Sequence, residues 1–247
     1  MRAHEPEVLN KWLDERAFVF ANVPYRIKPL EAILDNPNST IIFDAELSAN
    51  TRKQALEEGS DGALLRAADA SIQKANLTEK LLIPALVKLS NFVPGGGVWM
   101  NTERPEWNDA NNALVGNGLS MVTAGHLLRY VRFCRDWWSQ LDQDKQISLS
   151  APVADFIDSL LSIFSNKNTD PHVSTVDDVL RAQVVHELGL SGQCYREHIY
   201  AGEFENQRKL ALKTVLQLLE NADRWLRASL SASKRADGLM TVSYTHL

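Results

Sequence analysis

The chain has 247 residues, of which 45% are apolar and 23% are charged, and this is enough to bury one compact core of ordinary size. Its 26 Lys and Arg residues are outnumbered by 31 Asp and Glu residues and form no long basic run, which excludes the charge pattern of a nucleic-acid-binding protein. No stretch reaches the roughly 18 consecutive apolar residues of a membrane helix. We therefore expect a soluble protein with neither a nucleic-acid partner nor a membrane partner.

The first third of the chain alternates short helical patterns with one strand. β-branched and aromatic residues after an Asn-Pro-Asn turn predict a strand over residues 40–43. Asn76, with Glu79 three residues later, is typical of a capping box and predicts a helix that Pro84 bends or delays. Weaker helical patterns cover residues 8–20, 51–56 and 63–72.

The remainder of the chain carries longer amphipathic patterns. After Ser120, apolar residues recur at spacings of three and four, which predicts a long helix with one buried face. Residues 204–230 show the same spacing. Shorter helices are expected after Ser150 and after Thr175, and Gly189 is expected to end the second of these. The predicted fold class is all-α.

Two cysteines, Cys134 and Cys194, are too few for a disulfide framework. Both lie in helix-like segments, where a buried free thiol is the usual state. Free thiols slightly favour a cytoplasmic location, although the sequence leaves the compartment open.

Residues 93–118 interrupt the helical pattern. Connections longer than about 12 to 15 residues are uncommon inside compact domains and are usually either functional or disordered. Disorder is disfavoured here because the segment contains Trp99 and Trp107 together with several aliphatic residues. We therefore expect an ordered loop that contributes to function.

The polar residues of this loop suit a carbohydrate site. Such a site needs aromatic rings that stack on a sugar, amides that bind its hydroxyl groups and a carboxylic acid that protonates the leaving oxygen. The loop supplies the carboxylates of Glu103, Glu106 and Asp109 and the amides of Asn101, Asn108, Asn111 and Asn112. In the alternative interpretation Asp109 forms a turn, Trp107 fills a core pocket and the glutamates are solvated.

The order of residues within the loop resembles a known motif. The resemblance is carried by Trp107-Asn108-Asp109-Ala110-Asn111-Asn112, followed by Val115-Gly116, Gly118 and Ser120. Over about 15 residues this run is similar to the Trp-Asn-Asp-Gly-Met-Asn segment of the inverting disaccharide phosphorylases typified by cellobiose phosphorylase. Ala110 and Asn111 depart from the Gly and Met of that family, and Glu106 stands where the family has Asp.

The resemblance implies an (α/α)6 barrel of the six-hairpin glycosidase group, in which the Asp of the motif is the general acid. Asp109 takes that position in this chain. The expected substrate-binding residues are Trp107 and Trp99, which would stack on the sugar, and Glu106, Asn108 and Asn112, which would bind its hydroxyl groups.

The attacking nucleophile is left open between water and inorganic phosphate, and no other cofactor is expected. Phosphate as a co-substrate needs cationic or N–H partners, for which Arg104 and the Gly95–Gly97 run are candidates. Water needs a second carboxylate roughly 6.5 to 9.5 Å from the first. The candidates for that base are Asp44, Glu46 and Glu203, among which no spacing selects.

No metal site is predicted. His186-Glu187 does not continue to the His-Glu-x-x-His pattern of zinc enzymes, because position 190 is Leu. His198 follows Gly189 and Gly192, which are expected to interrupt the helix between the two histidines.

The end of the chain differs from the rest. Residues 239–247 show no helical period and no partner strand, and their last five residues resemble translated sequencing-adapter DNA. We therefore expect residues 1–238 to be a helical catalytic-domain fragment and residues 239–247 to be a non-native or disordered tail. An (α/α)6 barrel has twelve helices and the patterns predict about seven or eight, so the missing remainder of the barrel is an expected partner.

The sequence as a whole predicts a carbohydrate-active enzyme domain. It would cleave a glycosidic bond of an oligosaccharide by inversion, by hydrolysis or phosphorolysis, with Asp109 as general acid. The alternative is a non-catalytic helical module that binds a glycan or another protein, and the sequence leaves open whether the chain is an enzyme.

Overall fold

The computed structural model describes residues 6–67, 69–101, 114–166, 177–204 and 206–244. More than half of these residues are helical, which confirms a mostly α fold, while the predicted toroid stays a prediction. The helices are α1 (Pro6–Trp12), α2 (Leu30–Asp35), α3 (Ala45–Glu58), the 3-10 helix η1 (Gly59–Ala63), α4 (Leu77–Leu89), α6 (Met121–Trp138), α7 (Ala151–Ser165), α8 (Asp178–Ala201) and α9 (Leu212–Ala232).

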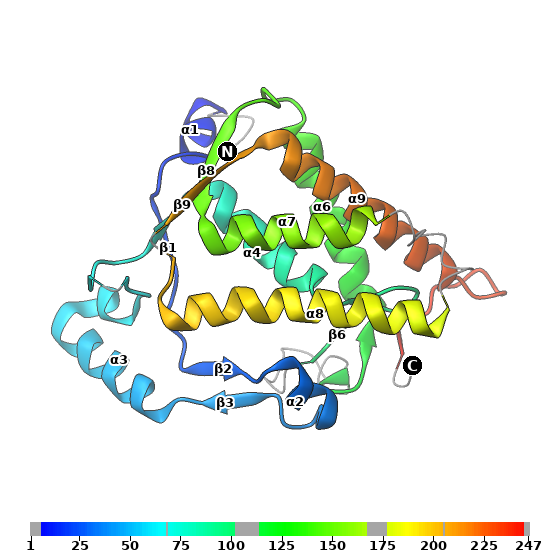
Figure 1. The fold of residues 1–247 in the computed structure, drawn as a ribbon, viewed down its shortest axis with the longest axis horizontal. Helices are drawn as coiled ribbons and strands as arrows, with labels where there is room; N and C mark the ends of the chain where they lie inside the picture. Colours follow the sequence, from blue (N-terminus) through cyan, green and yellow to red (C-terminus); the bar gives the residue numbers. More distant parts are fainter. Residues whose placement is uncertain (1–5, 68, 102–113, 167–176, 205, 245–247) are drawn as a thin grey trace.

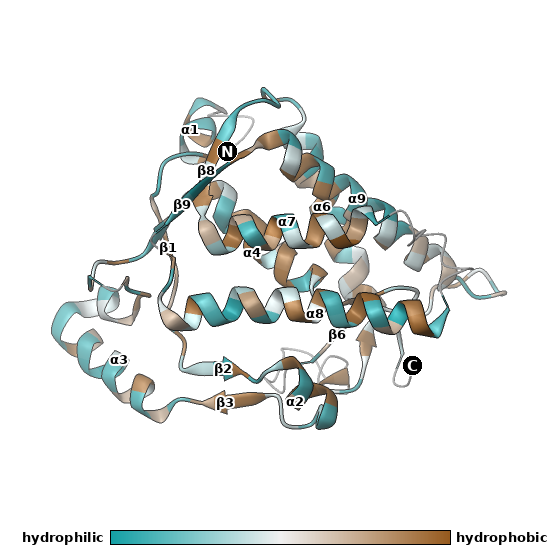
Figure 2. Cartoon of the chain, viewed as in Figure 1, coloured by the Kyte–Doolittle hydropathy of each residue, from teal (hydrophilic) through white to brown (hydrophobic). Residues whose placement is uncertain are grey.

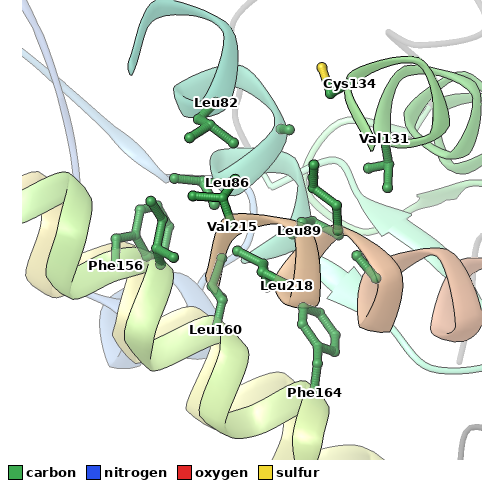
Figure 3. Close-up of a cluster of buried hydrophobic side chains, with 14 of the residues drawn as sticks. Leu82, Leu86, Leu89, Val131, Cys134, Phe156, Leu160, Phe164, Val215 and Leu218 are labelled. Atoms are coloured by element: carbon green, nitrogen blue, oxygen red, sulfur yellow. The ribbon is translucent and has the colours of Figure 1, made fainter. Parts of the chain in front are cut away.

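The core lies where α4, α6, α7 and α9 pack together, with α8 against α7 (Figure 1). Each helix contributes a stripe of apolar residues, and these stripes converge on one cluster. The side chains labelled in Figure 3 come from α4 (Leu82, Leu86 and Leu89), α6 (Val131 and Cys134), α7 (Phe156, Leu160 and Phe164) and α9 (Val215 and Leu218). Since Trp138 and Trp225 are also fully buried, one continuous core holds the helices together.

Short antiparallel strands join the ends of these helices. β8 (Gln146–Ser150) pairs with β9 (Gln207–Ala211) in a ribbon that links the start of α7 to the start of α9. A four-stranded sheet has the order β10 (Ser243–Tyr244), β7 (Leu119–Ser120), β6 (Gly97–Trp99) and β5 (Phe92–Val93). Two further pairs are β1 (Phe18–Val19) with β4 (Lys74–Ala75) and β2 (Tyr25–Ile27) with β3 (Ile41–Phe43). The predicted strand at residues 40–43 is therefore confirmed.

The N-terminal part of the chain contributes Leu9 and Leu13 to the core, and the segment that follows them wraps around the helices. α3 buries none of its residues and is largely hydrophilic in Figure 2. α2 is more firmly attached, because its Leu30 and Ile33 are buried and it packs against α8. Among the described residues, no helix combines the length and the apolar character that crossing a membrane requires.

Helix α8 differs from the prediction in its length. It begins after Asp177, whose side chain accepts a hydrogen bond from the Leu180 amide, and it runs through both Gly189 and Gly192 to Ala201. The expectation that Gly189 ends this helix is wrong. Both glycines are buried at crossings, where an added Cβ would lie 2.8 Å from Leu30 at Gly189 and 2.6 Å from Ser90 at Gly192. These glycines therefore allow close helix packing.

A pair of Gly→Ala substitutions tests this role. Gly192→Ala should destabilise the protein by about 1 kcal/mol, because crowding against Ser90 outweighs the gain in helix propensity. Gly125→Ala, in α6, is the matched control, since nothing lies within 4 Å of its added Cβ, and it should stabilise by roughly 0.5–1 kcal/mol. Urea unfolding measures both free energies. Two shifts of the same sign would contradict the packing role.

Three other predicted boundaries need correction. The helix expected from residue 204 begins at Leu212, because residues 207–211 form β9. The segment expected as a helix over residues 63–72 instead follows η1 with isolated bridges, including Arg66 to Ile72. The N-terminal helix ends at Trp12, and residues 18–19 pair as β1.

The C-terminal run has a partner strand, contrary to expectation. Ser243 and Tyr244 pair with Ser120 and Leu119, and the Met121 amide donates to the Val242 carbonyl at 3.0 Å. Ser243 and Tyr244 therefore form an edge strand of the four-stranded sheet. The non-native origin of residues 239–247 stays a prediction.

Candidate functional site

The predicted catalytic motif falls within residues 102–113, outside the described residues. This applies to Arg104, Glu106, Trp107, Asn108, Asp109 and Asn112. Their roles in acid catalysis and sugar binding therefore stay predictions. The described structure gives the frame that holds both ends of this segment.

The two ends of the segment are hydrogen-bonded to each other. The Gly116 amide donates to the Met100 carbonyl at 2.7 Å, and the Met100 amide donates to the Gly118 carbonyl at 3.0 Å. These bonds extend the β6–β7 pairing, in which Trp99 lies opposite Leu119. Met100 and Gly116, which lie on either side of residues 102–113 in the sequence, are therefore neighbours at the end of the β6–β7 pair.

Two residues predicted for the site fix this frame. The Trp99 indole is half-buried, and its Nε1 donates to the Gly116 carbonyl at 2.9 Å. Asn101 is buried, and its amide donates to Asn91 Oδ1 at 2.8 Å. The amide donor of Asn101 is therefore committed to the scaffold, and the N–H of Trp99 anchors the loop.

The glycine run forms the turn of the β5–β6 hairpin. Gly95 and Gly97 have φ values of 79° and 126°, which favour glycine over other residues. The Gly95 amide donates to Ser229 Oγ at 2.9 Å and the Gly96 amide to the Val93 carbonyl at 3.0 Å. Since these two N–H groups are engaged, the predicted phosphate cradle at Gly95–Gly97 is not supported.

The candidate second carboxylates have structural or surface positions. Asp44 caps α3 by accepting from the Leu47 amide at 2.8 Å, and Glu46 is exposed in the first turn of that helix. Glu203 contacts His198 Nδ1 at 2.8 Å, and both side chains are about half exposed. Among the described residues, no group of three His, Cys, Asp or Glu side chains is arranged to hold a metal ion.

The two cysteines are not equivalent, and the expectation that both are buried is wrong for Cys194. Cys194 is exposed, because its position on α8 faces away from α7 and the core. Cys134 is buried between helices, and this burial raises the pKa of its thiol. A hydrogen bond with Tyr130 offsets part of the rise, and the resulting pKa is about 11.

Thiol titration with Ellman's reagent at pH 8 should therefore detect one rapidly reacting thiol per folded chain and two after unfolding. At that pH a thiol with a pKa near 11 is almost wholly protonated and therefore unreactive. Cys194→Ser should remove the fast phase, whereas Cys134→Ser should leave it. A fast phase that survives Cys194→Ser would contradict the assignment.

A cavity that the sequence did not predict lies beside the C-terminal end of α8. Its volume is about 430 Å³, within the range of small-molecule sites. Its walls come from the chain around β1 and β2, from residues 65–67 and 73, from the first turns of α4 and from the last turns of α8. Segments far apart in the sequence therefore meet at this cavity.

Glu79 is the most buried charged group in the cavity wall. Its side chain accepts hydrogen bonds from the Ser150 amide at 2.9 Å and from Ser150 Oγ at 2.8 Å. The predicted capping box is thus only half formed, because Asn76 accepts from the Glu79 amide while the Glu79 carboxylate reaches β8 instead. Glu79 joins α4 to the start of α7 and faces the cavity.

Two tyrosines of α8 line the opposite wall. Burial raises the pKa of Tyr195, and the negative charge of Glu79 raises it further, so this phenol stays protonated. Its ring stacks on Phe156 with the centroids 5.0 Å apart. Tyr200 accepts a hydrogen bond from the Ile27 amide at 3.1 Å, and the Arg26 guanidinium lies 4.6 Å from its ring centroid. Both rings are therefore held in place.

Comparisons of the chain with protein-family models and with curated proteins find no match. The candidate sites therefore rest on the residues themselves: the motif at 107–112 with its hydrogen-bonded frame, and the cavity at the end of α8.

Proposed function

We propose that this chain is a carbohydrate-active enzyme domain that cleaves a glycosidic bond of an oligosaccharide with inversion of configuration. Asp109 is the general acid that protonates the leaving oxygen. Trp107 and Trp99 stack on the sugar. The hydroxyl groups are bound by Glu106, Asn108 and Asn112, and Arg104 binds phosphate where phosphate is the nucleophile.

The observation that carries the proposal is the order of residues in the motif. It places an acid, an indole and two amides together on a segment whose ends are tied by the Met100, Gly116 and Gly118 hydrogen bonds. Hydrogen bonds between the two ends of a loop favour a binding role, because binding residues are often carried on loops that a rigid scaffold positions. Because the Trp99 N–H already donates to the Gly116 carbonyl, Trp99 would contact a sugar by stacking through its ring.

The finer fold assignment is part of the same proposal. We infer that the helices are an (α/α)6 toroid or an incomplete part of one, as the family resemblance implies. The mostly α fold and the packing of α6 on α9 and of α7 on α8 are compatible with a helical-hairpin architecture.

Product stereochemistry tests the proposed reaction. The protein is incubated with a panel of disaccharides, with and without inorganic phosphate, and the first product is followed by proton NMR. The expected product has the anomeric configuration opposite to that of the substrate bond. Its formation only with phosphate identifies phosphorolysis, and its formation without phosphate identifies hydrolysis.

Two outcomes contradict the enzyme proposal. Retention of configuration would exclude a direct inverting displacement. Saturable binding of an oligosaccharide without any cleavage would favour the alternative, a non-catalytic module that binds a glycan.

A further inference from the structure

The cavity at the C-terminal end of α8 is lined by polar side chains whose hydrogen-bonding capacity is not used by the described residues. The Gln73 side chain is 7% exposed, and its amide forms no hydrogen bond with any described residue. The Tyr195 hydroxyl likewise has no hydrogen-bond partner in the described part of the chain. Because both groups line the cavity, they are available to hydrogen-bond a ligand that occupies it.

Glu79 adds an acceptor to the same wall. It is 3% exposed, and both of its hydrogen bonds come from Ser150, which is uncharged. No cationic side chain among the described residues forms an ion pair with it. A carboxylate has about four acceptor positions, so its remaining lone pairs are available to donors in the cavity.

The types of these three groups suit hydroxyl groups in particular. A carboxylate only accepts, whereas an amide and a phenol both donate and accept. A hydroxyl group also does both, so a ligand with several hydroxyl groups can satisfy all three. The rest of the wall includes the apolar side chains of Phe20 and Ile83, which can cover the C–H groups of a sugar-like ring.

Arg26 gives the cavity wall a cationic group whose N–H donors are largely unused by the described residues. Its guanidinium carries five N–H groups, and its single hydrogen bond to a described residue is a long contact of 3.5 Å to the Val23 carbonyl. The Tyr200 ring supports it at 4.6 Å. The other arginine in the wall, Arg66, is already paired with Glu58. A preformed guanidinium of this kind favours a carboxylate or phosphate group.

We propose that this cavity binds a monosaccharide-sized, polyhydroxylated organic anion. Glu79, Gln73 and Tyr195 bind its hydroxyl groups, and Arg26 binds its anionic group. The volume of about 430 Å³ accommodates a ligand of this size. This assignment uses no residue of the 102–113 segment, so it stands or falls independently of the proposed glycosidic cleavage.

Thermal unfolding and titration calorimetry with five probes test the assignment. The probes are glucuronate, glucose 6-phosphate, glucose, acetate and inorganic phosphate. At ten times its Kd, a hydroxylated anion should raise the Tm by roughly 3–6 °C. Glucose should bind at least 10-fold more weakly, and acetate and phosphate should have no saturable effect. Preference for glucuronate or for glucose 6-phosphate identifies the anionic group as carboxylate or phosphate.

Two variants and a matched control locate the binding. Arg26→Gln should weaken binding of the anion roughly 10- to 100-fold, since it removes a charge-assisted contact. Gln73→Leu, which keeps the size of the side chain, should weaken binding about 3- to 10-fold. Arg52→Gln, at an exposed position of α3 outside the cavity wall, should change nothing.

Far-UV circular dichroism without ligand verifies that each variant is folded. The assignment is overturned if neither hydroxylated anion binds saturably, if glucose binds as tightly as they do, or if folded Arg26→Gln and Gln73→Leu bind like the parent protein.

Discussion

Asp109→Asn is expected to lower the rate of glycosidic cleavage by about 10²- to 10⁴-fold, the contribution of a positioned general acid. An amide cannot supply the proton that the leaving oxygen needs. Because Asn keeps the size and polarity of the side chain, the Kd for an unreacted oligosaccharide should stay within about 3-fold of the parent value. Initial rates and titration calorimetry measure the two effects separately.

The leaving group distinguishes an acid from a residue with a structural role. An aryl glycoside with an acidic phenol as leaving group needs little protonation, so Asp109→Asn should lose much less activity on that substrate than on a disaccharide. Asp35→Asn, at the exposed end of α2, is a control that should retain full activity. Equal losses on both substrates would contradict the acid role, and unchanged rates would exclude Asp109 from the chemistry.

Asp223→Ala is expected to destabilise the protein by about 3 kcal/mol and to lower the Tm by roughly 6–12 °C. The side chain of Asp223 on α9 is 3% exposed, accepts a hydrogen bond from Arg132 Nε at 2.6 Å and forms an ion pair with Arg227, whose Nε lies 2.7 Å away. Arg135 Nη1 lies 3.5 Å from Asp223 Oδ1. Removal of the carboxylate leaves three guanidinium groups together without their shared anion. Urea unfolding gives the loss directly.

An exposed aspartate in the same region provides the control. Asp136 pairs with the neighbouring Arg135, but its side chain is 64% exposed, so Asp136→Ala should cost less than about 1 kcal/mol. Asp223→Asn keeps the acceptor and loses only the charge, so its cost should lie between the two. Equal effects of Asp223→Ala and Asp136→Ala would show that the buried cluster contributes no more than a surface pair.

The helices whose signals are local were predictable from the sequence. Ser120 was expected to cap a long helix, and its Oγ does accept from the Thr123 amide at 3.0 Å at the start of α6. Asn76 was expected to cap α4, and it does so through the Glu79 amide. Pro84 does not delay the start of that helix, which follows its Asn76 cap directly and runs from Leu77 to Leu89.

Features that depend on distant contacts were not predictable in this way. Residues 146–150 do alternate, with Ile147 and Leu149 buried, but β9 contains a single buried apolar residue, Leu210, and shows little pattern of its own. α8 continues through Gly189 and Gly192 because the helices crossing there need small residues. Both cases are decided by the partner segment, which the local sequence does not contain.

The two candidate sites differ in the same respect. The motif at 107–112 could be found from residue order, because its chemical groups are neighbours in the chain. The cavity could not, since its polar groups come from three separate parts of the chain, around Arg26, over Gln73 to Glu79, and at Tyr195. Glu79 in particular carried the signature of a helix cap, and only its hydrogen bonds to Ser150 place it in the cavity wall.

The hydrogen bonds that tie Met100 to Gly116 and Gly118 have an evolutionary consequence. When both ends of a loop are fixed by hydrogen bonds, residues between them can be inserted, deleted or exchanged while the helices of the scaffold keep their packing. Selection can therefore retune what the tip recognises without having to rebuild the molecule that carries it.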